Sequence, residues 1–349
     1  MLVAACGVAS STARDRARHR VCDRYAAPWG SDQHGRGTAR SPFATIGWLD
    51  HRLWAGQTGC LLSGRYGSIS SRQRLRNSGV RHARITIRAA PGASATVVGY
   101  ILLEGAYTTI SHLTIDGSND LFTQHPAGVD CSSPASEPLN IVGPNDILEY
   151  DNYYQSVPSL RGNGIGVGFW GDADNTIIRY NRIHDVGSCQ AYDHLIYLSH
   201  GNNVRIYDNW MWNDPHGRGI QLYPDPTNAR IWGNVIDHVG VGVGIGSEPG
   251  TEPRGNEIFG NVVIDSVGLP WEGLPGEALN VYWGSGSVGA DNSFQYNVSF
   301  RNPGGIGSPR GVAVAHNVTA NPGFADAAQH DYTIASSHRN VLRVLGHAR

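Results

Sequence analysis

The stretch Ile206-Tyr-Asp-Asn209-Trp-Met-Trp212 carries the most informative pattern of this chain: an asparagine between two short runs that contain apolar residues. The pattern occurs seven times, in Tyr-Asp-Asn152, Ile-Arg-Tyr-Asn181, Ile-Tyr-Asp-Asn209, Ile-Trp-Gly-Asn234, Ile-Phe-Gly-Asn261, Phe-Gln-Tyr-Asn297 and Val-Ala-His-Asn317. Successive asparagines lie 29, 28, 25, 27, 36 and 20 residues apart. Such a period is typical of a solenoid, and here each repeat predicts one rung of a parallel β-helix.

The asparagines have a physical role in this prediction. Asparagine tolerates the left-handed backbone conformation of a sharp turn, and its amide can bond the same turn of the next rung. We therefore expect the seven side chains to stack along one corner of an all-β coil. Each rung should contain three short strands, one before a long loop and two around the asparagine.

The strands before the long loops alternate apolar and polar residues. Because successive side chains of a strand point to opposite faces, their apolar members should point inward: Ile165, Val167, Ile196, Leu198, Ile220, Leu222, Val243, Ile245, Leu279 and Val281. The outward column is then Gly166, Tyr197, Gln221, Gly244 and Asn280, followed by Ser199, Tyr223 and Tyr282. We predict that Tyr197, Gln221, Asn280 and Tyr282 bind substrate, although an ordinary solvated sheet can look the same.

Composition narrows the possible partners. The 349 residues include 45 glycines and only 16% charged residues, which suits many tight turns. A net charge of -2 gives no reason to expect nucleic acid as a partner. No stretch is apolar enough to span a bilayer. All 27 basic residues are arginine. We expect a monomer.

Domain boundaries follow from where the repeats begin and end. Residues 1–21 are expected to be a disordered tail or a truncated export signal, 22–67 an N-terminal cap, 68–335 the solenoid and 336–349 a C-terminal tail. In the cap, Ser41 should begin a helix with Pro42 in its first position. A short strand should follow over residues 60–66.

The cysteines bear on the cellular location. Val3-Ala4-Ala5-Cys6 matches a lipoprotein processing site, so we expect a secreted or cell-surface protein, with Cys6 as a lipid attachment point. The other four should then form the disulfides Cys22–Cys60 and Cys131–Cys189. Four buried thiols in a cytosolic protein are the alternative.

The chain resembles the right-handed parallel β-helix superfamily, also called the pectin-lyase-like fold, over about residues 22–335. The resemblance rests on the repeats and on the opening Gly30-Ser-Asp32, Gly37-Thr38 and Ser41-Pro-Phe43. It implies a right-handed coil. Polysaccharide lyases, glycoside hydrolases, uronan epimerases and plain surface proteins share this fold, so it leaves the activity open.

Titratable residues are concentrated directly before two of the strands that carry the outward column. Asp193-His194 precedes one, and Asp214-Pro-His216-Gly-Arg218 precedes the next, which ends at Tyr223. Stacked rungs lie about 5 Å apart, so we predict one patch with six candidate catalytic residues: Asp193, His194, Asp214, His216, Arg218 and Tyr223. Aspartate and histidine at such corners also often bond only the backbone, which would be a structural role.

The favoured reaction for this patch is β-elimination of a uronate-containing glycan. Arg218 would hold the uronate carboxylate, His194, His216 or Tyr197 would remove the proton, and Tyr223 would act as acid. No cofactor is expected; related lyases use lysine or calcium, and with no lysine present a Ca²⁺ requirement stays open.

Three alternatives remain. A glycoside hydrolase would use Asp193 and Asp214 as its paired carboxylates, with Asp225, Glu248 and Glu277 in reserve. The Asp-Pro-His segment at 214–216 is similar to that of uronan carbon-5 epimerases, but Met211 stands where those enzymes have tyrosine. A non-catalytic carbohydrate-binding protein is the third alternative.

Overall fold

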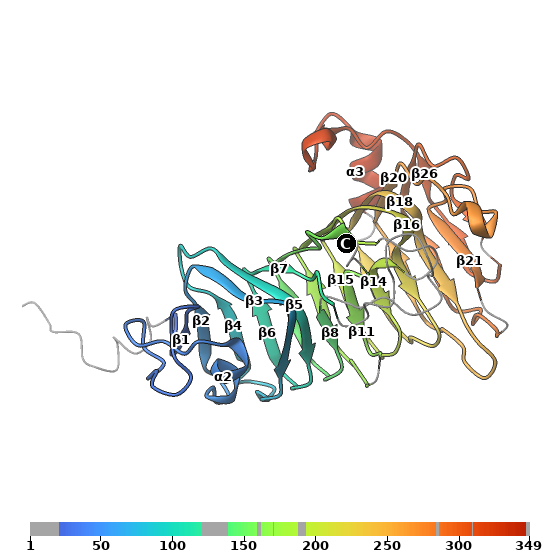
Figure 1. Ribbon diagram of the computed structural model, residues 1–349. Helices are drawn as coiled ribbons and strands as arrows, with labels where there is room; N and C mark the ends of the chain where they lie inside the picture. The colour runs from blue at the N-terminus through green and yellow to red at the C-terminus, as the bar shows by residue number, and fades with distance from the viewer. Residues whose placement is uncertain are drawn as a thin grey trace, which may run out of the picture.

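The computed structural model describes residues 21–120, 139–158, 162–169, 171–187, 193–283, 286–308 and 310–346. In these ranges the chain winds into an elongated coil of stacked, mostly parallel strands (Figure 1). The predicted all-β parallel solenoid is confirmed. The predicted disulfide Cys131–Cys189, the proposed lipid site Cys6 and the side chain of Tyr282 lie outside the described parts.

One flank of the coil is a parallel sheet that runs from end to end. Within the described residues it has 11 strands, one from each rung. In spatial order they are β1 Arg24–Ala26, β2 Thr58–Leu61, β4 Ile85–Ala89, β6 Thr108–Ser111, β9 Ile147–Glu149, β12 Ile177–Arg179, β15 Arg205–Tyr207, β17 Arg230–Trp232, β19 Glu257–Phe259, β22 Ser293–Gln295 and β25 Ala313–Ala315.

The other two flanks join into one sheet because the long strands β5 Ala95–Leu103, β16 Trp210–Leu222 and β18 Val235–Gly246 each pair with strands of both flanks. Its strands are β3 Gly64–Leu75, β5 Ala95–Leu103, β7 Thr114–Asp116, β8 Leu139–Ile141, β10 Asn152–Tyr154, β11 Ile165–Val167, β13 Arg182–His184, β14 His194–Leu198, β16 Trp210–Leu222, β18 Val235–Gly246, β20 Val262–Ile264, β21 Leu279–Trp283, β23 Val298–Phe300, β24 Gly307–Ser308 and β26 Val318–Thr319. The start of β16 pairs with β13, and its end pairs with β14.

Strand β16 corrects one prediction. We expected two strands around 209–212 and 219–223, separated by the segment from Asp214 to Arg218. The structure has one strand of 13 residues with an irregular register between Asp214 and Arg218. An irregularity of this kind bends a strand while keeping its pairing, so the charged segment lies within the sheet at the corner.

Each end of the coil carries additional structure (Figure 1). Helix α2, Ile46–His51, packs beside the first strands. At the other end, the antiparallel pair β27 Phe324–Asp326 and β28 Asp331–Ile334 precedes helix α3, Arg339–Gly346. The short 3-10 helices are η2, Pro270–Glu272, and η3, Ala327–Gln329. The segment expected to be a featureless tail therefore contains a helix.

The start of α2 differs from the prediction. Its capping residue is Thr45, whose hydroxyl accepts a hydrogen bond from the backbone of Trp48 at 3.1 Å, so Ser41 is not the cap. The reason is Asp32, whose carboxylate accepts hydrogen bonds from the N–H and the hydroxyl of Thr45 at 3.1 and 2.8 Å. The predicted disulfide Cys22–Cys60 is present beside this segment.

Amide side chains stack along one buried corner, as predicted. The Nδ2 group of Asn181 donates to Oδ1 of Asn209 at 3.0 Å, and Asn209 donates to Asn234 at 2.9 Å. The series continues through Asn261, Asn297 and Asn317 at 2.9, 3.0 and 3.1 Å. The same oxygens accept backbone N–H groups, so the ladder satisfies buried polar atoms at every turn.

Two details of this ladder correct the prediction. The member in the earliest of these rungs is Asp151, whose N–H donates to Asn181 at 3.0 Å, whereas Asn152 begins strand β10. The left-handed residue is the one before each ladder amide, such as Tyr180 at φ 57° or Asp208 at φ 54°. The bend and the amide bond therefore fall on two successive residues.

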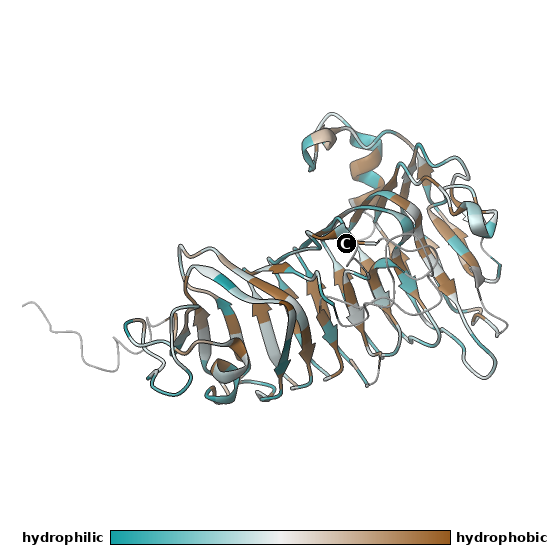
Figure 2. Cartoon of the chain, viewed as in Figure 1, coloured by the Kyte–Doolittle hydropathy of each residue, from teal (hydrophilic) through white to brown (hydrophobic). Residues whose placement is uncertain are grey.

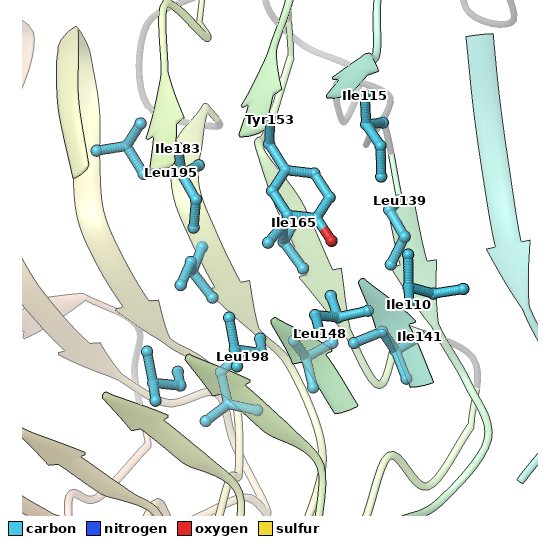
Figure 3. Close-up of a cluster of buried hydrophobic side chains, with 14 of the residues drawn as sticks. Ile110, Ile115, Leu139, Ile141, Leu148, Tyr153, Ile165, Ile183, Leu195 and Leu198 are labelled. Carbon is cyan, nitrogen blue, oxygen red and sulfur yellow. The ribbon is translucent and has the colours of Figure 1, made fainter. Parts of the chain in front are cut away.

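The interior is a continuous apolar core that follows the coil axis. Apolar residues alternate with polar ones along the strands (Figure 2). In Figure 3, Ile115 and Leu139 from one rung lie next to Tyr153 and Ile165, respectively, from the following rung. All ten side chains predicted to point inward are buried in this core.

Candidate functional site

The candidate site lies on the flank formed by β8, β11, β14, the end of β16, the end of β18 and β21. We call it the site face. Register places Gly166 beside Tyr197, Tyr197 beside Gln221, Gln221 beside Gly244 and Gly244 beside Asn280. The predicted outward column is therefore present. It extends one strand further, to Asn140 beside Gly166.

This column is buried, unlike an ordinary solvated sheet. Asn140, Gln221 and Asn280 are at most 2% exposed. In the described parts of the chain, no hydrogen-bond partner is found for either polar atom of the Asn140 amide, for Oε1 of Gln221 or for Oδ1 of Asn280. A buried polar atom without a partner costs about 1–3 kcal/mol. These groups therefore suit a ligand that supplies hydroxyls.

Arg218 crosses the middle of the column. Its side chain passes directly over Gly244, where an added Cβ would lie 2.5 Å from Cδ of Arg218 and 2.5 Å from Oε1 of Gln221. Its Nη2 group donates to Oε2 of Glu272 at 2.7 Å. Burial lowers the pKa of Arg218 to about 10, opposed by the charge of Glu272. The guanidinium thus stays charged at neutral pH.

His194 lies beside Arg218 and is also buried. Its Nδ1 accepts the backbone N–H of Arg218 at 3.2 Å, and its ring stacks on Tyr197 with centroids 5.3 Å apart. Burial and the nearby Arg218 charge hold the pKa of His194 well below its usual value. The imidazole is therefore neutral, with its proton on Nε2, and it presents a donor to its surroundings.

The two candidate aspartates lie beneath the bulge of β16. Asp193 and Asp214 are 0% exposed. The carboxyl of Asp214 packs closely against Gly187 and Gly217, where added Cβ atoms would come within 2.4 and 2.7 Å of its oxygens. Burial, reinforced by Asp193, raises the pKa of Asp214 well above its usual value. This environment favours a structural, protonated carboxyl over a catalytic carboxylate.

The remaining predicted residues are spread along the face. Tyr197 is half-buried, lies within 4.7 Å of the Phe169 ring and interacts electrostatically with Arg218. His216 is exposed at the corner. Tyr223 donates to Glu248 at 3.2 Å. It follows Arg218 by five residues of extended strand, roughly 16 Å, so the two do not converge on one sugar.

Sequence reasoning missed Glu272 and gave Glu277 only a minor place. Glu272 belongs to η2, between β20 and β21, and burial raises its pKa while Arg218 lowers it. Glu277 accepts from Nδ2 of Asn280 at 2.7 Å. The available signal was the 36-residue interval between Asn261 and Asn297, which marks a longer loop in this rung.

The described residues hold neither a cluster of metal ligands nor a membrane-spanning helix. No group of three or more His, Cys, Asp or Glu side chains there is placed to hold a metal ion. The helices in the same ranges are too short or too polar to cross a membrane.

Sequence comparison assigns the coil to a family. Residues 99–302, more than half of the chain, match the profile of the right-handed β-helix region. The chain belongs to the right-handed β-helix family. The predicted handedness and the resemblance to the pectin-lyase-like fold are thus confirmed. No curated protein matches the sequence.

Several solved structures resemble the coil at low sequence identity. Pectate lyase Pel9A is 12% identical with a TM-score of 0.58, over 89% of this chain and 84% of its own. A glycoside hydrolase is 9% identical with a TM-score of 0.52, over 91% and 99%. XylC, solved with xylose, is 13% identical with a TM-score of 0.49, and the match spans 79% of this chain and 65% of XylC. These similarities show a shared fold and nothing about activity.

Proposed function

We propose that this β-helix protein acts on a polysaccharide that lies along the site face. The observation that carries the proposal is the buried column of carboxamides with Arg218 at its centre. Asn140, Gln221 and Asn280 offer amide atoms to sugar hydroxyls, and the Arg218 side chain lies over Gly244 between two of them. The column crosses several rungs, which suits a polymer more than a single sugar.

The proposed reaction is β-elimination within a uronate-containing glycan. Arg218 would bind the uronate carboxylate, which increases the acidity of the C5–H bond. The Tyr197 phenolate would remove the C5 proton as the C4–C5 double bond forms and the bond from C4 to the glycosidic oxygen breaks. The leaving oxygen would take up a proton, which the newly formed Tyr197 phenol can supply.

Two roles in this proposal differ from those expected from the sequence. His194 would serve as a neutral Nε2–H donor, because Nδ1 is engaged by the backbone of Arg218. Tyr223 would contact a more distant sugar. Because Arg218 is 1% exposed and bonded to Glu272, a substrate carboxylate would reach it as neighbouring side chains, Glu272 among them, move aside.

A panel of polyuronates tests the proposal. Elimination produces an unsaturated sugar that absorbs ultraviolet light, so we expect absorbance to rise with polygalacturonate, alginate or another uronan. Tyr197→Phe should lower kcat by roughly 10²–10⁴-fold with little change in binding, and Arg218→Gln should also weaken binding. Arg205→Gln, an exposed arginine on the opposite flank, is the matched control. No absorbance change with any uronan would contradict elimination.

Glycoside hydrolysis is the second candidate, and one observation favours it. The raised pKa of Glu272, caused by burial, is suited to a general acid, and Glu277 lies on the same flank beside Asn280. New reducing ends without an unsaturated product, lost on Glu272→Gln, would support hydrolysis.

We also propose that the protein is secreted, because the proposed substrate is a polysaccharide and the disulfide Cys22–Cys60 suits an oxidising compartment.

A further inference from the structure

A hollow lies at the N-terminal end of the coil, away from the site face. It has a volume of about 710 Å³. We call it the N-terminal cleft and define it by Arg24, Arg36, Trp48, Arg52 and Trp54. Arg24 lies on β1 and Trp48 on α2, at the end opposite α3 (Figure 1).

The cleft presents aromatic surface to solvent. Trp54 is 73% exposed, and Trp48 beside it is half-buried. The backbone that carries Trp54 is held in a tight turn, because its N–H donates to the side chain of Gln57 at 3.0 Å and its carbonyl accepts the N–H of Gln57 at 2.9 Å. An exposed indole on this backbone offers a flat apolar face to a ligand in the hollow.

The cleft is also positively charged. None of Arg24, Arg36 and Arg52 forms an ion pair within the described residues, whereas Arg74, Arg179, Arg230 and Arg301 each have a carboxylate partner. The carboxylate that borders the cleft belongs to Asp32, which already accepts hydrogen bonds from Ala44 and Thr45. Three arginines against this one carboxylate leave the cleft with a net positive charge.

The exposed indole and the arginines of the N-terminal cleft together suit one class of ligand. An indole face packs against the C–H groups of a pyranose ring, and a guanidinium binds a carboxylate through two parallel hydrogen bonds. The guanidinium of Arg52 lies over the Trp48 ring, 4.6 Å from its centroid, and the exposed indole of Trp54 lines the same cleft. A sugar that carries both features is a uronate.

We propose that the N-terminal cleft is an accessory binding site for uronate residues of a glycan chain. The inference rests on the proposed function for its choice of polymer. A polymer held at this end and on the site face of the same molecule would dissociate more slowly, because the second contact is intramolecular. The cleft contributes anchoring and takes no part in bond cleavage.

Titration calorimetry on the full chain tests the accessory site, with oligogalacturonate and oligoalginate as probes and cello-oligosaccharide as the neutral comparison. Trp54→Ala and Arg52→Gln should each weaken uronate binding about tenfold. Trp29→Ala and Arg40→Gln are the matched controls, since both residues are exposed on the same end but do not line the cleft. The controls should bind as the wild type does.

The outcomes separate this site from the proposed function. If Trp54→Ala binds uronate as tightly as the wild type, or if the neutral oligosaccharide binds equally well, the accessory site is wrong whatever the activity. If uronate binding depends on Trp54 but no uronan is ever cleaved, the accessory site stands and the lyase proposal fails.

Discussion

At residue scale, the position of Asp151 stands out because the other ladder positions from Asn181 to Asn317 carry asparagine. Its carboxyl accepts the N–H of Leu113 at 2.7 Å and the hydroxyl of Tyr153 at 3.0 Å, in full burial. Burial raises the pKa of Asp151 to about 8. The protonated carboxyl closely resembles a carboxamide, which explains how an acid fits among amides.

This raised pKa predicts a pH-dependent effect of Asp151→Asn. The Asp151 carboxyl keeps its proton up to about pH 8 in the folded state but only up to about pH 4 in the unfolded state. The protonated carboxyl therefore contributes its full stability below about pH 4, and this contribution is lost as the pH rises towards 8. Asparagine does not titrate. We expect the stability of Asp151→Asn relative to the wild type to rise by about 1 kcal/mol per pH unit in this window.

Denaturant unfolding at several pH values between 5 and 8, roughly the range between the free and buried values, measures this difference. Asp331→Asn is the control, because Asp331 is exposed and its pKa is lowered by hydrogen bonds to Thr333, so it stays ionised throughout. Parallel curves for the wild type and Asp151→Asn would show that Asp151 is already ionised in the folded protein.

At the scale of elements, the bulge in β16 sets the position of Arg218. Gly217 has no space for a side chain, since an added Cβ would lie 1.4 Å from the carbonyl oxygen of Asp193 and 2.7 Å from Oδ2 of Asp214. The irregular register thus depends on a glycine that lets two rungs approach closely. Arg218 follows directly and reaches across Gly244 as a result.

Gly217→Ala is therefore expected to destabilise the protein by more than about 4 kcal/mol, in the range of the most damaging substitutions. Thermal melting and soluble yield measure the effect. Gly47→Ala in α2 is the control: its nearest neighbours are 3.8 Å away, and alanine in a helix should stabilise by about 0.5–1 kcal/mol. A wild-type melting temperature for Gly217→Ala would mean that the bulge adjusts without cost.

At the scale of the whole molecule, each rung contacts mainly its neighbours, so stability should be local along the coil. The disulfide Cys22–Cys60 spans 38 residues at one end and should stabilise that end by about 4 kcal/mol in the chain-entropy estimate. Reduction should then loosen the first rungs and leave the middle of the coil intact.

Hydrogen exchange with and without reductant tests this local effect. We expect faster exchange over residues 21–62 and unchanged exchange at the asparagine ladder. The variant with Cys22→Ser and Cys60→Ser should exchange rapidly at this end under both conditions. Cooperative loosening of the whole coil on reduction would contradict the nearest-neighbour description.

The linear order of residues was enough to identify the coil, its inward and outward columns and the disulfide Cys22–Cys60. The coil and its columns depend on period and alternation, which are properties of neighbouring residues. The ladder position was predicted for Asn152 but is occupied by Asp151. This error shows the limit of reasoning from the period, because a shift of one residue within a turn leaves the period unchanged.

The candidate site required the folded chain. The Arg218–Glu272 pair joins residues 54 positions apart from different rungs, and the burial of Asp214 depends on glycines in two segments. The tautomer of His194 follows from a backbone N–H of the next rung. Such contacts depend on how a loop folds back over the sheet and on solvent exclusion, and local sequence patterns encode neither.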